Sequence, residues 1–244
     1  MSEEARQMFP KGLKQPETGF RFSTDSLLLS SFVPVSGKCR ILDLGTGCGV
    51  IPLGIALRNP VEDLYITGVD INPVMLECAN HNVAESGFTD KIEILEGNVC
   101  NPQFAPAESY DVVVSNPPYW CEGRGRPCPD ADRNRARFEV EAELEDFAKT
   151  AARMVRFRGK VCFVFLAERV TPLLAVLTRF KLEPKRIKFV HSHMDRSAKV
   201  VLVEAVKNGK AGLIVEPPLV LFEDKSKGSV YSQSALDFCK FIMK

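Results

Sequence analysis

The sequence lacks the features that would assign it to several large classes of protein. Its longest uninterrupted apolar stretch, Val161 to Ala167, is far shorter than the roughly 20 residues that a membrane-spanning helix needs. Met1 to Lys14 are polar and carry charges of both signs, so we expect no export signal there. Internal repeats and low-complexity tracts are missing as well. With 45% hydrophobic and 26% charged residues, the composition is that of an ordinary globular protein.

The spacing that a metal site or a disulfide framework requires is also missing. The eight cysteines include no C-x-x-C pair, and His191 and His193 have no evident third ligand. We therefore predict no metal ion, and we expect reduced, mostly buried thiols in a protein of the cytoplasm. The net charge of +1 makes no global case for nucleic acid, and no segment suggests a membrane as a partner.

Apolar runs that end in turn residues predict a mostly parallel, doubly wound sheet in an α/β fold. The run at 112–114 contains only β-branched residues, which is typical of a strand buried on both faces. Further strands are expected at residues 38–44, 65–69, 92–95 and 161–166, and helices at 51–58, 74–86 and 171–180. Residues 186–191 and 199–205 should close the sheet as an antiparallel pair. A helix is also expected after Ser23 or Thr24, in a segment that could close over a cofactor.

A glycine-rich turn follows the first predicted strand. After Asp43 it contains Gly45, Thr46, Gly47 and Gly49, and a helix follows, a layout in which a ligand can approach the backbone and a helix N-terminus. The spacing is G-x-G-x-G and not the G-x-G-x-x-G of dinucleotide-binding proteins, so a nicotinamide enzyme is disfavoured. An Asp in front of the glycines suits a ligand with an amino group, and the α-amino group of S-adenosylmethionine is one.

The next two predicted strands also end in polar residues. Asp70, followed by Ile71, lies about 20 residues past the glycines, where an acid can bind both ribose hydroxyls. The alternative role for Asp70 is a helix cap, because Asn72 and Pro73 open the next helix. Asn98 follows the third strand, where its side chain could hydrogen-bond an adenine amino edge or simply form a turn.

The fourth strand ends in the sequence Ser115-Asn116-Pro117-Pro118-Tyr119. The prolines hold Asn116 and Pro117 stiffly and leave their carbonyls available as acceptors. The Asn116 side-chain oxygen and a neighbouring carbonyl form two acceptors aimed at one point, which suits a planar amino group. Tyr119 and Trp120 offer flat faces on which a base can stack. Taken alone, however, such a sequence is equally typical of an ordinary turn.

Together, the four strand ends resemble the motifs of class I S-adenosylmethionine-dependent methyltransferases that act on exocyclic amino nitrogens. More narrowly, residues 15–235 resemble the bacterial tRNA1(Val) adenine N6-methyltransferases. This narrower likeness rests on residues 20–28, 136–139, 168–169, 184–186, 190–191, 217–219 and 231. Two positions depart from it: Asn98 stands where the family usually has Asp, and Phe138 stands where His is expected.

The resemblance implies a Rossmann-like fold, S-adenosyl-L-methionine as cofactor and tRNA as substrate, methylated at the adenine 3′ of the anticodon in a valine tRNA. A chain of this length can bury a full core in one domain. We predict a flexible N-terminus at 1–14 and one methyltransferase domain at 15–244. Within it we expect a cofactor half at about 38–120, a basic substrate loop at 121–138 and a sheet-completing half at 139–244. We favour a monomer.

The resemblance also assigns roles to residues. The predicted catalytic residues are Asn116, Pro117 and Tyr119. Those predicted to bind the cofactor are Asp43, Gly45, Thr46, Gly47, Gly49, Asp70, Ile71, Asn98, Val99 and Asn116. Those predicted to bind the substrate are Pro118, Tyr119, Trp120, Arg124, Arg126, Arg133, Arg135 and Arg137.

The distribution of charge supports an RNA partner. The five arginines between 124 and 137 are interleaved with Gly and Pro, which is typical of a surface loop. From Lys149 to Lys188, eleven basic residues face only two acids, Glu168 and Glu183, as expected of a protein that binds a phosphate backbone. The alternative is a solvated helix face.

Two other functions fit the same residues. Because a glutamine amide is also a planar nitrogen, the chain could be an N5-glutamine methyltransferase acting on a protein such as a release factor. It could also be a non-catalytic, RNA-binding relative of the methyltransferases. The basic loop and the lack of an evident peptide-binding N-terminal domain favour RNA over protein as the substrate.

Overall fold

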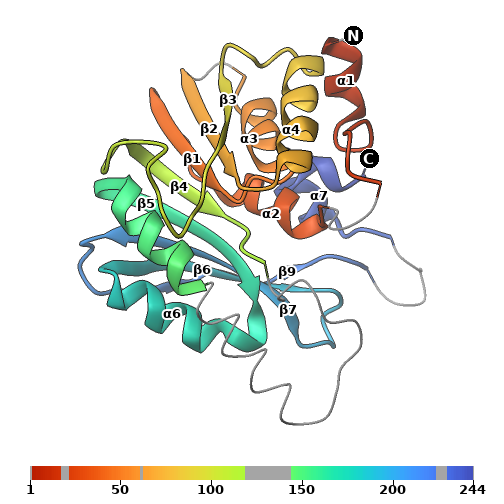
Figure 1. Ribbon diagram of the computed structural model, residues 1–244. Helices are drawn as coiled ribbons and strands as arrows, with labels where there is room; N and C mark the ends of the chain where they lie inside the picture. The colour runs from red at the N-terminus through yellow and green to blue at the C-terminus, as the bar shows by residue number, and fades with distance from the viewer. Residues whose placement is uncertain (1, 18–21, 61–62, 119–143, 224–229, 244) are drawn as a thin grey trace, which may run out of the picture.

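The computed structural model describes residues 2–17, 22–60, 63–118, 144–223 and 230–243 (Figure 1). Its centre is a sheet with the strand order β3-β2-β1-β4-β5-β7-β6-β8, and β9 also pairs with β6. The strands are β1 (Cys39–Leu44), β2 (Leu64–Asp70), β3 (Ile92–Glu96), β4 (Tyr110–Ser115), β5 (Val155–Leu166), β6 (Leu182–His191), β7 (Ala198–Lys207), β8 (Ile214–Val215) and β9 (Leu219–Val220).

Strands β3, β2, β1, β4 and β5 are parallel, so their carboxyl ends lie at one edge of the sheet. β7 is antiparallel to both β5 and β6, which confirms the predicted closing pair. β5 starts six residues before the predicted 161, at Val155, because a register shift against β4 lets the polar stretch 156–160 continue the strand. This shift includes Arg158 at a positive φ of 61°.

Helices cover both faces of the sheet. One face carries α2 (Thr24–Phe32), α3 (Val50–Arg58) and α4 (Pro73–Glu85), and the other carries the helix over residues 144–154 and α6 (Val170–Arg179), preceded by the 3₁₀ turn η1 (Ala167–Arg169) (Figure 1). Alternate residues of each strand point to opposite faces. Val112 and Val114 therefore join the core under α2 and α3, while Val113 joins the core under the other helices.

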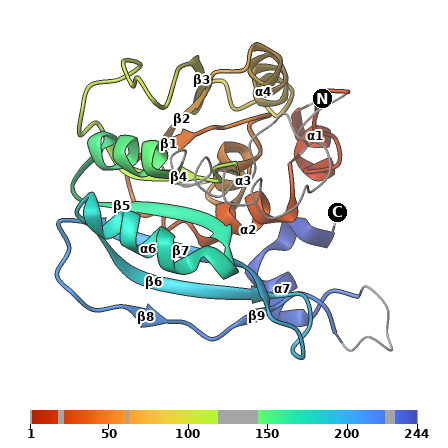
Figure 2. The same cartoon turned by 60° about the horizontal axis from the view of Figure 1, so that its bottom comes forward.

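The two chain ends lie close together on the face that carries α3 and α4 (Figure 2). At the N-terminal end, α1 (Ser2–Met8) leads to Phe9, which is only 1% exposed and packs edge-on against Phe241 at a ring distance of 5.0 Å. At the C-terminal end are the short helix α7 (Gln233–Phe238) and the 3₁₀ turn η3 (Lys240–Met243). The N-terminal segment, expected to be flexible, thus contributes a side chain to the core.

Candidate functional site

The glycine turn connects β1 to α3 at the carboxyl edge of the sheet. Gly45, Gly47 and Gly49 all have positive φ, at 72°, 56° and 80°, which residues with a side chain rarely adopt. The turn is fixed to the neighbouring strand because the backbone N–H groups of Gly45 and Thr46 both donate to the Val69 carbonyl at 2.9 Å. The turn therefore has a backbone conformation that favours glycine, at the position where the sequence predicts that a ligand can approach.

Asp43, two residues before Gly45 in β1, is fully buried. Neither of its carboxylate oxygens has a hydrogen-bond partner among the residues that the structure describes, and the same holds for the Thr46 hydroxyl. Burial raises the pKa of Asp43 to about 7, and the negative charge of Asp70 adds to this, although the nearby Thr46 hydroxyl partly offsets it. An unpaired buried carboxylate is costly, and none of the described residues supplies its donor, so the position of Asp43 suits a ligand that brings a donor group.

Asp70 ends β2 and spans the gap between two loops. Its Oδ2 accepts from the Gly47 backbone N–H at 2.8 Å, and its Oδ1 accepts from the Asn72 backbone N–H at 2.9 Å. The cap of α4 is Asn72, whose side chain accepts from Val74, so Asp70 does not take the alternative capping role. A carboxylate offers about four lone-pair sites, so Asp70 can accept further hydrogen bonds. The next residue, Ile71, leaves 61% of its surface exposed.

Asn98 and Val99 lie beyond the end of β3. The Asn98 side-chain oxygen accepts from the Cys100 backbone N–H at 2.8 Å, and its carbonyl accepts from the Asn101 N–H. These bonds form a tight turn at an exposed position, which is the simpler of the two predictions for Asn98. The Val99 carbonyl accepts from the Thr150 hydroxyl at 2.7 Å, which ties the turn to the helix over residues 144–154.

The Asn-Pro-Pro elbow follows β4 next to the glycine turn. β1 and β4 are paired with Leu44 opposite Ser115, and the Ser115 hydroxyl donates to the Leu44 carbonyl at 2.8 Å, so Asn116 is level with Gly45. Pro117 is buried and Pro118 is exposed. The Asn116 side chain donates to the Ser26 hydroxyl of α2 at 2.9 Å. The elbow is thus held by a neighbouring strand and by a helix.

One pocket brings the glycine turn and the elbow together. Its lining residues are Phe22, Ser26, Gly45, Thr46, Gly47, Cys48, Val50, Ile51, Met75 and Asn116. Gly45, Thr46, Gly47 and Asn116 were predicted as site residues, while Asp43 lies beneath the turn and Asp70 reaches it through Gly47. The structure does not place Asn98 or Val99 in this lining.

The sequence analysis missed several residues of the lining, notably Phe22, Ser26 and Met75. Phe22 precedes α2 and Ser26 lies in its first turn, in the segment expected to close over a cofactor. That expectation identified the segment but not the side chains, because the inward-facing side of a helix start depends on how the helix packs. Met75 lies in the first turn of α4, five residues past Asp70, and no local signal marks it.

Comparison with known proteins identifies the family. A protein from Tolumonas auensis named tRNA1(Val) (adenine(37)-N6)-methyltransferase is 32% identical over 184 residues, which cover 72% of this chain and 75% of that protein. A protein of the same name from Phocaeicola vulgatus is 33% identical over 183 residues, 75% of each chain. This chain belongs to the tRNA1(Val) (adenine(37)-N6)-methyltransferase family. The family model of the methyltransferase small domain also matches residues 21–126.

Solved structures support the fold of this family member. A crystal structure described as a predicted O-methyltransferase from Agrobacterium tumefaciens matches with a TM-score of 0.69 and 24% identity, and the match covers 88% of this chain and 94% of that one. The predicted Rossmann-like α/β fold, with a mostly parallel sheet and antiparallel closing strands, is therefore confirmed. At this level of identity the likeness says nothing about the substrate.

Most of the residues predicted to bind the substrate of this family member lie outside the part of the chain that the structure describes. This applies to Tyr119, Trp120, Arg124, Arg126, Arg133, Arg135 and Arg137, so their roles stay predictions. Within the described ranges, no helix is long and apolar enough to cross a membrane. In the same part of the chain, no group of three or more His, Cys, Asp or Glu side chains could hold a metal ion.

The basic stretch from 149 to 188 is less unbalanced than its sequence suggests. Acids from other segments neutralise several of its members: Arg156 pairs with Asp111, Lys160 with Glu204, Arg179 with Glu145, Arg186 with Glu204 and Glu216, and Lys188 with Glu216. Glu168 and Glu183 are the only acids within the stretch itself, but the fold brings acids from outside it, such as Glu204 on the neighbouring strand β7, next to its basic residues. The stretch as a whole is therefore not a free phosphate-binding surface.

Proposed function

We propose that this chain transfers a methyl group from S-adenosyl-L-methionine to the exocyclic N6 of an adenine in tRNA, the adenine 3′ of the anticodon in a valine tRNA. The curated relatives are named for this reaction. A tRNA substrate would place the reaction in the cytoplasm. We propose a monomer as the active species.

The observation that carries the proposal is the shared pocket at the carboxyl edge of the sheet. Asn116 and the open backbone of the glycine turn both line it, which supports the proposal. One side of the pocket is thus suited to a ligand that needs close backbone approach, and the other is suited to an amino group. A methyl donor and a nitrogen acceptor need this kind of juxtaposition, since proximity supplies much of the rate enhancement.

The residues present fit S-adenosyl-L-methionine. Asp43 is a buried carboxylate without a partner in the described part of the chain, and the cationic amino group of the cofactor would supply one. A Cβ at position 47 would meet no atom within 4 Å, so lack of space does not explain the glycine. Glycine is required there because the backbone has a positive φ. Asp70 retains acceptor capacity for ribose hydroxyls, and the exposed Ile71 offers apolar surface to the adenine ring.

The protein's part in the reaction is to hold a weak nucleophile. When bound, S-adenosyl-L-methionine supplies a methyl group on a positively charged sulfur, which is a strong electrophile. The adenine amine is a poor nucleophile because its lone pair is delocalised into the ring. The Asn116 side-chain oxygen and the Pro117 carbonyl accept the two amine hydrogens and direct the lone pair out of the ring plane. These hydrogen bonds strengthen as positive charge develops on the nitrogen, so they stabilise the transition state selectively.

Replacement of Asn116 by Ala tests this assignment. We expect methyl transfer to fall by about 100-fold or more, as when a single transition-state hydrogen-bonding group is removed. The Kd for S-adenosyl-L-methionine, measured by calorimetry, should change by less than about threefold, because Asp43, the glycine turn and Asp70 remain. Asn80→Ala is the matched control, since the Asn80 side chain donates to the Leu76 carbonyl within α4. Loss of both transfer and cofactor binding would make Asn116 structural and not catalytic.

The substrate is tested by methyl transfer from labelled S-adenosyl-L-methionine to unmodified bacterial tRNA, followed by nucleoside analysis. The proposal expects label as N6-methyladenosine in a valine tRNA. Label that appears only in an added release factor would assign the chain to glutamine methylation. No transfer to either substrate by a chain that binds the cofactor would favour the non-catalytic alternative.

A further inference from the structure

The contact between Asn116 and Ser26 joins two segments that are 90 residues apart. The Asn116 Nδ2 donates to the Ser26 Oγ at 2.9 Å, and both side chains line the pocket. Ser26 is only 4% exposed, so bulk water does not compete for this bond. An amide engaged through its nitrogen presents its oxygen on the opposite branch. This is the orientation that the proposed acceptor role of Asn116 requires.

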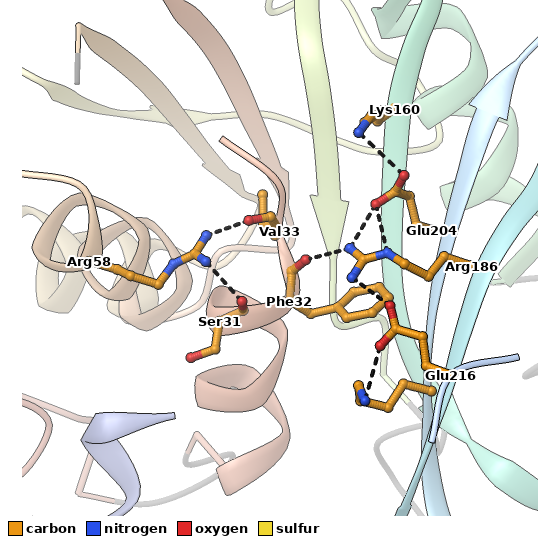
Figure 3. Close-up of polar contacts among 9 residues, drawn as sticks. Ser31, Phe32, Val33, Arg58, Lys160, Arg186, Glu204 and Glu216 are labelled. Carbon is orange, nitrogen blue, oxygen red and sulfur yellow. Dashed lines mark hydrogen bonds and ion pairs between the residues drawn. The ribbon is translucent and has the colours of Figure 1, made fainter. Parts of the chain in front are cut away.

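Ser26 lies on a helix that is anchored at its other end (Figure 3). Arg58 of α3 donates to the carbonyls of Ser31 and Val33, and Arg186 of β6 donates to the Phe32 carbonyl at 3.0 Å. These carbonyls belong to the last turn and the C-cap of α2, where helices leave acceptors without intrahelical partners.

The anchoring arginine of β6 is itself fixed. Arg186 lies over the Phe32 ring at 4.0 Å from its centre, and its guanidinium bonds Glu204 and Glu216 on opposite sides (Figure 3). The middle of α2 is equally constrained, because Leu28 and Leu29 are fully buried. With both its end and its middle held, the helix cannot follow a movement of the elbow, and Ser26 provides a fixed point for the Asn116 side chain.

We infer that Ser26 is a positioning residue: its hydroxyl holds the Asn116 carboxamide in the orientation that turns the amide oxygen toward the amine to be methylated. This inference rests on the proposed function, in which Asn116 accepts a hydrogen bond from that amine. Ser26 touches neither reacting group in this account and acts only through Asn116.

The first test compares Ser26→Ala with Ser30→Ala. Ser30 lies one helical turn further along α2, is also buried, and donates to the Leu27 carbonyl within the helix. We expect Ser26→Ala to lower kcat about tenfold, the effect of losing one hydrogen bond in the transition state, with KM for S-adenosyl-L-methionine within about twofold of the wild type. Ser30→Ala should leave kcat within about twofold, and Ser26→Thr, which keeps the hydroxyl, should recover most of it.

Two further measurements separate positioning from a general structural effect. In the Asn116→Ala background, Ser26→Ala should lower kcat by no more than about twofold, because a residue that acts through Asn116 has nothing left to position. By NMR, the side-chain NH₂ signal of Asn116, assigned from its loss in Asn116→Ala, should shift in Ser26→Ala and stay in place in Ser30→Ala.

Three results would overturn the inference: wild-type kcat in Ser26→Ala, an undiminished tenfold loss in the Asn116→Ala background, or an unmoved NH₂ signal. The NMR measurement does not depend on the substrate. If the wild-type protein methylates no RNA, the proposed function fails, and the position of the signal alone decides whether Ser26 holds the Asn116 amide.

Discussion

Asp43 shows at the scale of one residue how the site is prepared for a ligand. Its pKa, raised by burial to about 7, means that the folded protein binds a proton there at pH values where the unfolded chain has lost it. Between about pH 4 and pH 7 the native state therefore holds more protons than the unfolded state. This difference makes the stability of the unliganded protein fall as the pH rises through that window.

Replacing Asp43 by Asn should remove this pH dependence. We expect the substitution to favour the unliganded fold more at pH 8 than at pH 5, by roughly 2–3 kcal/mol, because a shift of one pKa unit is worth about 1.4 kcal/mol. Urea unfolding of wild type and variant at both pH values measures the effect, with the exposed Asp90→Asn as control. An Asp43→Asn variant with the wild-type pH dependence would show that another group titrates.

The residues of the site differ in how far the sequence could predict them. Several of them lie at or next to the carboxyl end of a strand: Asp43, the glycines, Asp70 and Asn116. Parallel strands bring such ends to one edge of the sheet, so the proximity of these residues followed from local patterns. The Ser26 contact with Asn116 had no such signal, because it depends on the packing angle of α2 against the sheet. The use of Asn98 as a turn also escaped a firm prediction, since an Asn after a strand suits both a turn and a ligand.

At the scale of elements, the N-terminal segment is integrated into the fold by side-chain contacts. Arg6 donates to the carbonyls of Ser86 and Gly87 at the end of α4. Further along, the Asn82 side chain exchanges hydrogen bonds with the backbone of Lys14 and also donates to the Cys48 carbonyl in the glycine turn. The segment therefore contacts the helix that supports the site as well as the core.

Substitution of Phe9 tests whether these contacts persist in solution. Phe9→Ala should destabilise the protein by about 3–5 kcal/mol, the usual cost of truncating a fully buried aromatic side chain. Met8→Ala is the control, because Met8 is 52% exposed and should change the unfolding free energy by less than about 0.5 kcal/mol. Chemical denaturation measures both. Equal, small effects would support the flexible N-terminus that the sequence analysis expected.

The elements themselves were predicted where the hydrophobic pattern was unbroken. Val112 to Val114 became a strand as expected, because an unbroken apolar run must be buried, and Ile92 to Leu95 became one as well although Glu93 interrupts its apolar residues. The first half of β5 was missed because Arg156, Arg158 and Lys160 give it a polar pattern. In the fold, Arg156 pairs with Asp111 and Lys160 pairs with Glu204, so these charges are compatible with a strand. Both acids are distant in sequence, so no local pattern could indicate the pairs.

At the scale of the whole molecule, exposed lysines lie at both edges of the sheet, but the pocket lies at only one of them. The pocket lies at the carboxyl edge, where β7 also begins, since Val200 pairs with Leu166 at the end of β5. Lys199 is exposed at this edge, where its positive charge partly offsets the rise in pKa that burial causes at the half-buried Asp25 of α2. Lys181 is exposed at the opposite edge, just before β6. A tRNA that places a base in the pocket should contact the first of these and not the second.

Neutralising each lysine in turn tests which edge binds RNA. If Lys199 contacts a phosphate, Lys199→Gln should raise KM for tRNA about fivefold at physiological salt and reduce the slope of log KM against log salt concentration by about 1, with kcat unchanged. Lys181→Gln should leave both quantities as in the wild type. The measurement is a salt series of methyl-transfer rates on tRNA. The same response from both lysines would contradict binding at the carboxyl edge, because charge alone and not position would then govern the affinity.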